Sequence, residues 1–175
     1  MPARVSPSAA LPIAYLVLRT VIIVNWLWGV AIIALLVAAP TERWIMSSLD
    51  LFPGPDADRV VMAFRIIAGI GLITIPLNYA ILKRLLAMVE TVRAGDPFVA
   101  ANAYRLQTIA WVLFALQLIS IVIGGIAKHV STPEHEIHLN AGFSITGWLA
   151  VILTFLLARV FAAGTLMRED LEWTV

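Results

Sequence analysis

Three histidines lie close together in the polar segment KHVSTPEHEIHLN, and they are the first residues of the chain that could do chemistry. His135 and His138 are spaced i, i+3, so they would share one face of a helical turn, and His129 lies upstream. Zinc accepts imidazole nitrogens together with a carboxylate oxygen, which Glu134 or Glu136 could supply. The spacing differs from His-Glu-x-x-His, in which a glutamate acts as base. Two interpretations stay open: a metal site at these histidines, or exposed imidazoles that titrate near neutral pH.

Two polar side chains lie inside long apolar runs. Arg65 is about two helical turns inside the second run, and Gln117 is near the middle of the third. An ionisable group at membrane depth is by default a candidate functional residue, although a long arginine side chain also reaches the headgroups. Arg65 and Gln117 therefore mark a candidate site for a small hydrophobic or anionic ligand.

Other classes of chemistry lack the residues that they need. The chain has no cysteine, so it offers no thiolate nucleophile and no thiolate metal ligand. No Asp or Glu lies within the apolar runs, where a proton-coupled transporter needs a carboxylate relay. No nucleophile is paired with a base, so we predict no catalytic residue, no cofactor and no enzymatic activity. The net charge of +1 argues against direct nucleic-acid binding.

The segment RAGDPFVAANAYRLQ is polar although the chain around it is apolar. Gly95 is a typical helix terminator, Asp96 a typical N-cap and Pro97 a typical first helical residue. The pattern predicts that one helix ends near Ala94 and that the next begins at Pro97, in a tight hairpin. The hairpin and the C-terminal tail give a candidate partner-binding surface, made of Arg93, Asp96, Phe98, Asn102, Arg105, Glu169 and Asp170. The alternative is a solvated helix extension whose charges lie at the lipid headgroups.

Composition places these segments in a membrane. The 175 residues are 61% hydrophobic and 13% charged, whereas soluble domains are about 45–50% apolar and about 25% charged. Four runs reach the length of about 20 apolar residues that a span needs, at 11–39, 60–82, 108–127 and 141–166. Spans of this length are helices, and short connections make neighbours antiparallel. We therefore predict an all-α membrane protein, a single integral domain over 1–175 with four transmembrane helices in an up-down bundle.

The positive charges indicate the orientation. Lysine and arginine gather on the side that would hold both termini and the segment at 83–107, and cytoplasmic segments carry such an excess. A second helix over residues 60–94 would measure about 52 Å, whereas the hydrocarbon core is about 30 Å thick. Helices two and three should therefore extend into the cytoplasm as a tight hairpin, about 15–20 Å beyond the core.

Two segments carry a resemblance to a known family. The first contains Gly95, Asp96, Pro97, Phe98, Asn102, Arg105 and Leu106, and the second contains Gly164, Leu166, Asp170, Thr174 and Val175. This pattern resembles the bacterial four-span membrane family known as domain of unknown function 2975. The resemblance carries no established activity. Its members are often encoded beside Xre-type helix-turn-helix regulators, so the resemblance implies such a regulator as a partner.

Three functions follow, in order of preference. The first is a non-enzymatic regulatory or sensor protein of the bacterial cytoplasmic (inner) membrane, which docks a cytoplasmic helix-turn-helix regulator on its hairpin and tail. The second is a protein that binds or transports a small hydrophobic or anionic ligand or lipid in the bundle core. The third is a membrane metalloprotein that uses the histidine segment. The lipid bilayer is a partner in all three, and the sequence leaves homo-oligomerisation open.

Overall fold

The computed structural model describes residues 10–38, 57–131 and 141–172, and every regular element within these ranges is a helix. The elements are α1 (Ala10–Ala38), α3 (Ala57–Arg93), α4 (Ala100–Val130) and α5 (Ile145–Glu172). All four are long and apolar enough to cross a membrane, as the sequence predicts. At most 17% of the residues in each apolar window are buried inside the protein. Most of the apolar surface therefore faces outward, which is the pattern of helices surrounded by lipid.

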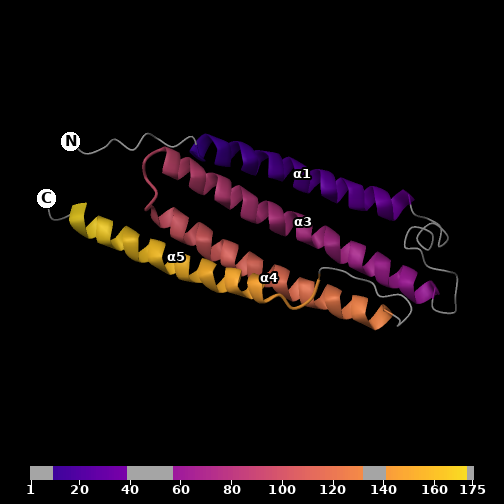
Figure 1. The fold of residues 1–175 in the computed structure, drawn as a ribbon. Coiled ribbons are helices and arrows are strands. Elements are labelled where there is room, and N and C mark those ends of the chain that lie inside the picture. Colours follow the sequence, from indigo (N-terminus) through magenta and orange to yellow (C-terminus); the bar gives the residue numbers. More distant parts are fainter. Residues whose placement is uncertain (1–9, 39–56, 132–140, 173–175) are drawn as a thin grey trace.

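The helices pack in chain order. Among the described residues, α1 contacts α3, α3 contacts α4 and α4 contacts α5, whereas α1 contacts neither α4 nor α5. Figure 1 shows the four helices side by side, with each running opposite to the one before it. The start of α1 and the end of α5 lie at the same end of the molecule (Figure 1). The arrangement is an open row, which differs from a bundle closed by contact between its first and last helices.

The first two helices, α1 and α3, contact each other beside Pro76, which lies inside α3. The Asn25 side chain of α1 donates a hydrogen bond to the carbonyl of Ile75, with Nδ2 and O 3.1 Å apart. A Cβ atom at Gly29 would lie 3.2 Å from Cγ2 of Ile75, so glycine lets the two backbones approach. Proline removes one backbone donor from α3. A polar side chain from the neighbouring helix thus reaches the backbone of α3 next to this interruption.

The last helix begins later than predicted. The sequence places the fourth span from residue 141, but residues 141–144 are not helical and α5 begins at Ile145. Gly142 has a φ of 129°, and the Ser120 hydroxyl of α4 both accepts from its N–H and donates to its C=O. The Ser144 hydroxyl then accepts a hydrogen bond from the N–H of Gly147, as a capping side chain does. The first four residues of the predicted span at 141–166 are therefore not helical, because Ser120 on α4 holds this backbone in another conformation.

Two adjacent glycines of α4 allow a direct test of the packing against this segment. A Cβ atom at Gly124 would lie 2.6 Å from Cα of Gly142, whereas one at Gly125 would meet nothing within 4 Å. Gly124→Ala should therefore cost about 1–3 kcal/mol of stability, because backbone on both sides has to move. Gly125→Ala should be neutral or stabilise the helix by up to about 1 kcal/mol. Thermal unfolding of the detergent-solubilised variants measures both, and an equal loss in the two would contradict the packing.

Candidate functional site

The polar candidates of the hairpin meet at a turn that ends α3. The N–H of Asp96 donates to the carbonyl of Thr91 at 3.0 Å, and the N–H of Gly95 donates to that of Val92 at 3.1 Å. Gly95 has a φ of 86°, a conformation that glycine adopts at no steric cost. This pair of bonds is the Schellman motif, which satisfies the last carbonyls of a helix. Gly95 thus ends the helix, as its type predicts.

The next helix does not begin where the local sequence predicts. Asp96 and Pro97 are typical of a helix start, yet α4 begins at Ala100 with Val99 as its N-cap residue. Val99 is extended, with φ −109° and ψ 144°, and no side chain caps the helix. The prediction that α4 starts at Pro97 is therefore wrong. The carboxylate of Asp96 forms an ion pair with Arg168 of α5 instead of capping α4.

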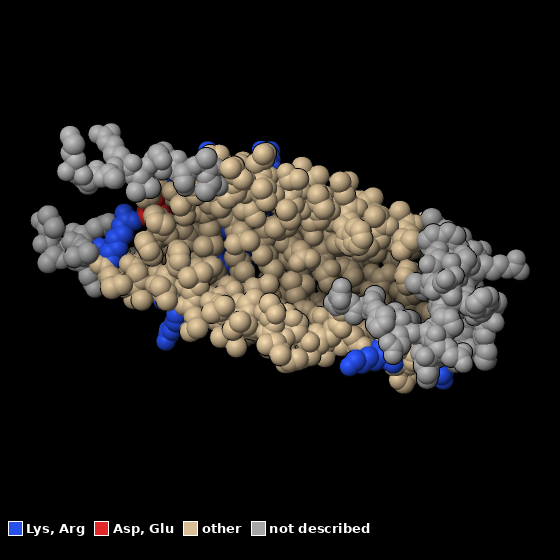
Figure 2. All heavy atoms as spheres, in the orientation of Figure 1, with Lys and Arg blue, Asp and Glu red and all other residues tan. Residues whose placement is uncertain are grey.

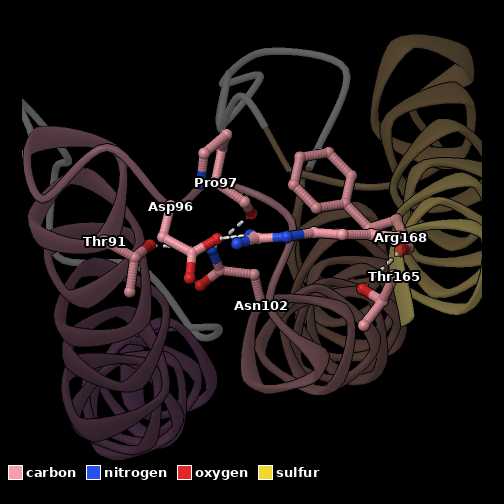
Figure 3. A network of polar contacts seen from close by, with 7 residues as sticks. Thr91, Asp96, Pro97, Asn102, Thr165 and Arg168 are labelled. Carbon is pink, nitrogen blue, oxygen red and sulfur yellow. Dashed lines mark hydrogen bonds and ion pairs between the residues drawn. The ribbon is translucent and has the colours of Figure 1, made fainter. Parts of the chain in front are cut away.

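Asn102 holds the turn to both helices of the hairpin. Its side-chain N–H₂ group donates to the Thr91 hydroxyl on α3 at 2.7 Å and to the Pro97 carbonyl at 2.9 Å. Its oxygen accepts a hydrogen bond from Arg105 at 2.7 Å. Figure 3 shows Asn102 pointing between α3 and the turn. The side chain is fully buried, at 0% exposure. Its N–H₂ group and its oxygen both have hydrogen-bond partners within the protein.

The network continues along α3. The Thr91 hydroxyl donates to the carbonyl of Met88 at 2.8 Å while it accepts from Asn102. The Arg105 guanidinium donates to Asn102 and also approaches the carbonyl of Ala87, with the two atoms 3.4 Å apart. Arg105 and Asn102 therefore join α4 to the last two turns of α3. Both residues position the tip, and neither presents its polar atoms mainly outward.

The tip of the hairpin rests on α5 through an aromatic contact. The rings of Phe98 and Phe161 lie 5.3 Å apart between centroids. A Cβ atom at Gly164 would lie 3.0 Å from Cδ1 of Phe98, so the missing side chain makes room for this ring. Phe98 remains 44% exposed. Half of the ring therefore packs on α5, and the rest is open to a neighbour.

An ion pair between Asp96 and Arg168 completes this junction (Figure 3). The two side chains are 42% and 47% exposed, so solvent screens their attraction. Phe161, Gly164, Thr165 and Arg168 recur at helical spacing and share one face of α5. We call Asp96, Phe98, Phe161, Gly164 and Arg168 the hairpin–α5 junction.

Two arginines of α3 contact groups outside α5. Arg84 donates to the carbonyl of Ala80 on its own helix at 2.9 Å, and Arg93 lies over the ring of Tyr15, 5.3 Å from its centroid. The ion pair described between the hairpin and α5 has the acid on the hairpin and the base on α5. The side chains of Glu169 and Asp170 lie outside the described residues, although their backbone belongs to α5.

The two predicted ligand-binding residues lie in different parts of the row. Arg65 is exposed on α3 and lines a cavity of about 450 Å³ with Asp58, Val61, Met62 and Ile66. Gln117 lies on α4 against α5, where its amide contacts Gly147. The described lining of the Arg65 cavity does not include Gln117.

The histidines fall mostly outside the described chain. His129 is exposed in the last turn of α4, whereas His135 and His138 lie outside the described residues. Within residues 10–38, 57–131 and 141–172, no cluster of three metal-ligating side chains occurs. The metal site at His129, His135 and His138 stays a prediction.

Sequence reasoning did not select Thr91, Phe161 or Arg168 for this site. The spacing of Phe161, Gly164 and Arg168 on one helical face was the available signal, because a glycine between larger residues marks room for a neighbour. Thr91 carried no signal beyond a polar residue in the turn before Gly95. Comparisons of the chain with known protein families, curated proteins and solved structures gave no match.

The buried amide and the exposed ion pair should differ in their effect on stability. Asn102→Ala leaves the Pro97 carbonyl, Thr91 and Arg105 without this partner and should cost about 1–3 kcal/mol. Asp96→Asn removes only a solvent-exposed charge pair and should cost less than about 1 kcal/mol. Thermal unfolding in detergent gives the order, and trypsin cleavage after Arg93 should speed up in Asn102→Ala alone. The reverse order of stabilities would contradict the assignment of Asn102 as the residue that holds the tip.

Proposed function

We propose that the chain is a non-enzymatic regulatory protein of the bacterial cytoplasmic membrane, which docks a cytoplasmic helix-turn-helix regulator on its hairpin tip and the adjoining end of α5. The observation that carries the proposal is the hairpin–α5 junction. Three of its residues, Asp96, Phe98 and Gly164, belong to the two segments that resemble the four-span family, and these segments are far apart in the sequence. Phe98 of the first segment packs against Gly164 of the second.

The membrane placement follows from charge and helix length. In this placement the four helices run up and down, both termini and the hairpin are cytoplasmic, and the ends of α3 and α4 extend past the hydrocarbon core. The 37 residues of α3 support the extension, because they measure about 55 Å against a core of about 30 Å. The excess of Lys and Arg on the hairpin side supports the orientation.

The tip exposes both apolar and charged side chains to such a partner. Phe98 is 44% exposed and Val92 is 38% exposed, and Arg93, the next residue in the chain after Val92, is exposed as well. Aromatic and arginine side chains surrounded by polar groups are typical anchors of protein interfaces. Asn102 lies beneath this surface and keeps it in shape, because its own side chain is fully buried. A docked partner would contact the hairpin and α5 together, so it would respond to how the two are joined.

Capture of the intact, solubilised protein tests the proposal. We expect the Xre-type regulator encoded beside the chain to co-purify with it. Phe98→Ala and Val92→Glu should each reduce the captured regulator at least about tenfold, which corresponds to about 1.4 kcal/mol. Val92→Glu changes only the exposed tip, whereas Phe98→Ala also loosens the junction. The two variants thus separate surface from packing.

The matched control is Ile145→Ala, which removes a 77% exposed apolar side chain at the opposite end of α5. It should capture as much regulator as the parent. Absence of the regulator from the parent complex, or equal capture by parent, Phe98→Ala and Val92→Glu, would overturn the proposed function.

A further inference from the structure

The segment that enters α5 runs beside α4 well before α4 ends. Ser120 exchanges hydrogen bonds with both backbone groups of Gly142, at 3.2 and 3.1 Å. A Cβ atom at Gly124 would lie 2.8 Å from the carbonyl oxygen of Ala141. Figure 1 shows α4 continuing past the start of α5. Non-helical backbone therefore lies against the side of α4, about 15 Å short of its end at 1.5 Å per residue.

Charged residues place this segment inside the membrane. Arg65 and Ala87, whose carbonyl faces Arg105, are about 33 Å apart along α3, close to the thickness of a hydrocarbon core. Lys128 of α4 marks the same end of the row as Arg65. Counted from Lys128, Gly124 lies about 6 Å deep and Ser120 about 12 Å deep. Figure 2 shows an uncharged band between basic residues towards the two ends.

The competing placement puts the membrane surface at the first residue of α5. The hydrocarbon core would then shift toward the hairpin by about 15 Å. It would move Lys83 and Arg84 from within about 6 Å of the edge of the core to about 12–14 Å inside it, and it would enclose Arg105. It would also leave Ile121 and Val122 in water although they are 38% and 52% exposed. An ionised side chain in hydrocarbon is costly, whereas backbone in a non-helical stretch is tolerated if it lines a water-filled cavity. The first placement therefore costs less.

In the interface between α4 and α5, two polar side-chain atoms have no hydrogen-bond partner among the described residues. Oε1 of Gln117, an acceptor, and Nε1 of Trp148, a donor, are both buried without a hydrogen bond. Gln117 packs on Gly147, the residue before Trp148, and the Trp148 ring lies 5.6 Å from that of Phe114. A neutral group that donates a hydrogen bond to Oε1 or accepts one from Nε1 would satisfy either atom. Water is the smallest such group.

We propose that Gln117, Ser120, the backbone at 141–144 and Trp148 form a hydrated niche, which admits water from the Lys128 side to near the middle of the membrane. We call it the α4–α5 niche. It lies at the opposite end of α5 from the hairpin–α5 junction, so it is independent of the docking of a regulator.

Single cysteines test the niche cleanly, because the natural chain has none. Ser120→Cys places a thiol of similar size beside Gly142, and Ala141→Cys places one on the non-helical segment. The matched control is Val122→Cys, which lies at nearly the same depth and is 52% exposed, but on the opposite side of α4. His129→Cys, at the exposed end of α4, reports reagent access. The probe is a small, charged, membrane-impermeant methanethiosulfonate applied to sealed vesicles of each orientation.

We expect Ser120→Cys and Ala141→Cys to react at least about tenfold faster than Val122→Cys, and only from the side on which His129→Cys reacts. A thiol in lipid stays protonated and out of reach of a charged reagent, whereas one in a hydrated niche ionises. Equal reaction of Val122→Cys would show that α4 protrudes into water there and would overturn the niche. Unreactive Ser120→Cys and Ala141→Cys beside a reactive His129→Cys would show a sealed interface and would overturn it too. Either niche variant alone suffices if the other fails to fold.

Discussion

The hairpin depends on one buried amide. The side chain of Asn102 has two donors and one acceptor facing the protein, and it uses them on α3, on the turn and on its own helix. An apolar residue in its place would leave the Pro97 carbonyl without this donor and the Thr91 hydroxyl with only its bond to Met88, beside a position that is fully buried. An aspartate would lose the donors that reach these two oxygens. The amide therefore fixes the turn, the end of α3 and the start of α4 at once.

The position of Phe98 follows from that of Asn102. The bond to the Pro97 carbonyl keeps the chain extended just before α4, and this places the next residue against α5. Gly164 has no side chain to oppose the ring, so packing forms the junction and the exposed Asp96–Arg168 pair adds little. A change in the tilt of α5 would thus reach the exposed half of Phe98 through packing, without any rearrangement of the buried network.

The sequence predicts the helices well and their starts poorly. Apolar runs and charge are enough for four spanning helices, and Gly95 is enough for the end of α3, because these features are local. The start of α5 is set by a distant side chain, because Ser120 holds Gly142. At the start of α4, Asn102 in the first helical turn bonds to the Pro97 carbonyl and reaches Thr91 on α3, which the local signal of Asp96 and Pro97 does not include. The sequence pattern indicated Phe98 and Asn102 as candidates. It could not show that Asn102 is buried and positions the turn, or that Phe98 is partly exposed, because burial depends on contacts with other helices.

The open row raises the question of what holds neighbouring helices together in lipid. Apolar side chains gain little by leaving lipid for a helix interface, so close packing and interhelical hydrogen bonds must supply the association.

Each pair of neighbours has such a bond: Asn25 joins α1 to α3, Asn102 joins α3 to α4, and Ser120 joins α4 to the segment that enters α5. Glycines allow the approach beside the first and the last, at Gly29 and Gly124. A bond of this kind contributes about 0.6–2 kcal/mol, so each contact is held separately and weakly. Because α1 contacts α3 alone and α5 contacts α4 alone among the described helices, either end helix can separate from the row by breaking one helix pair.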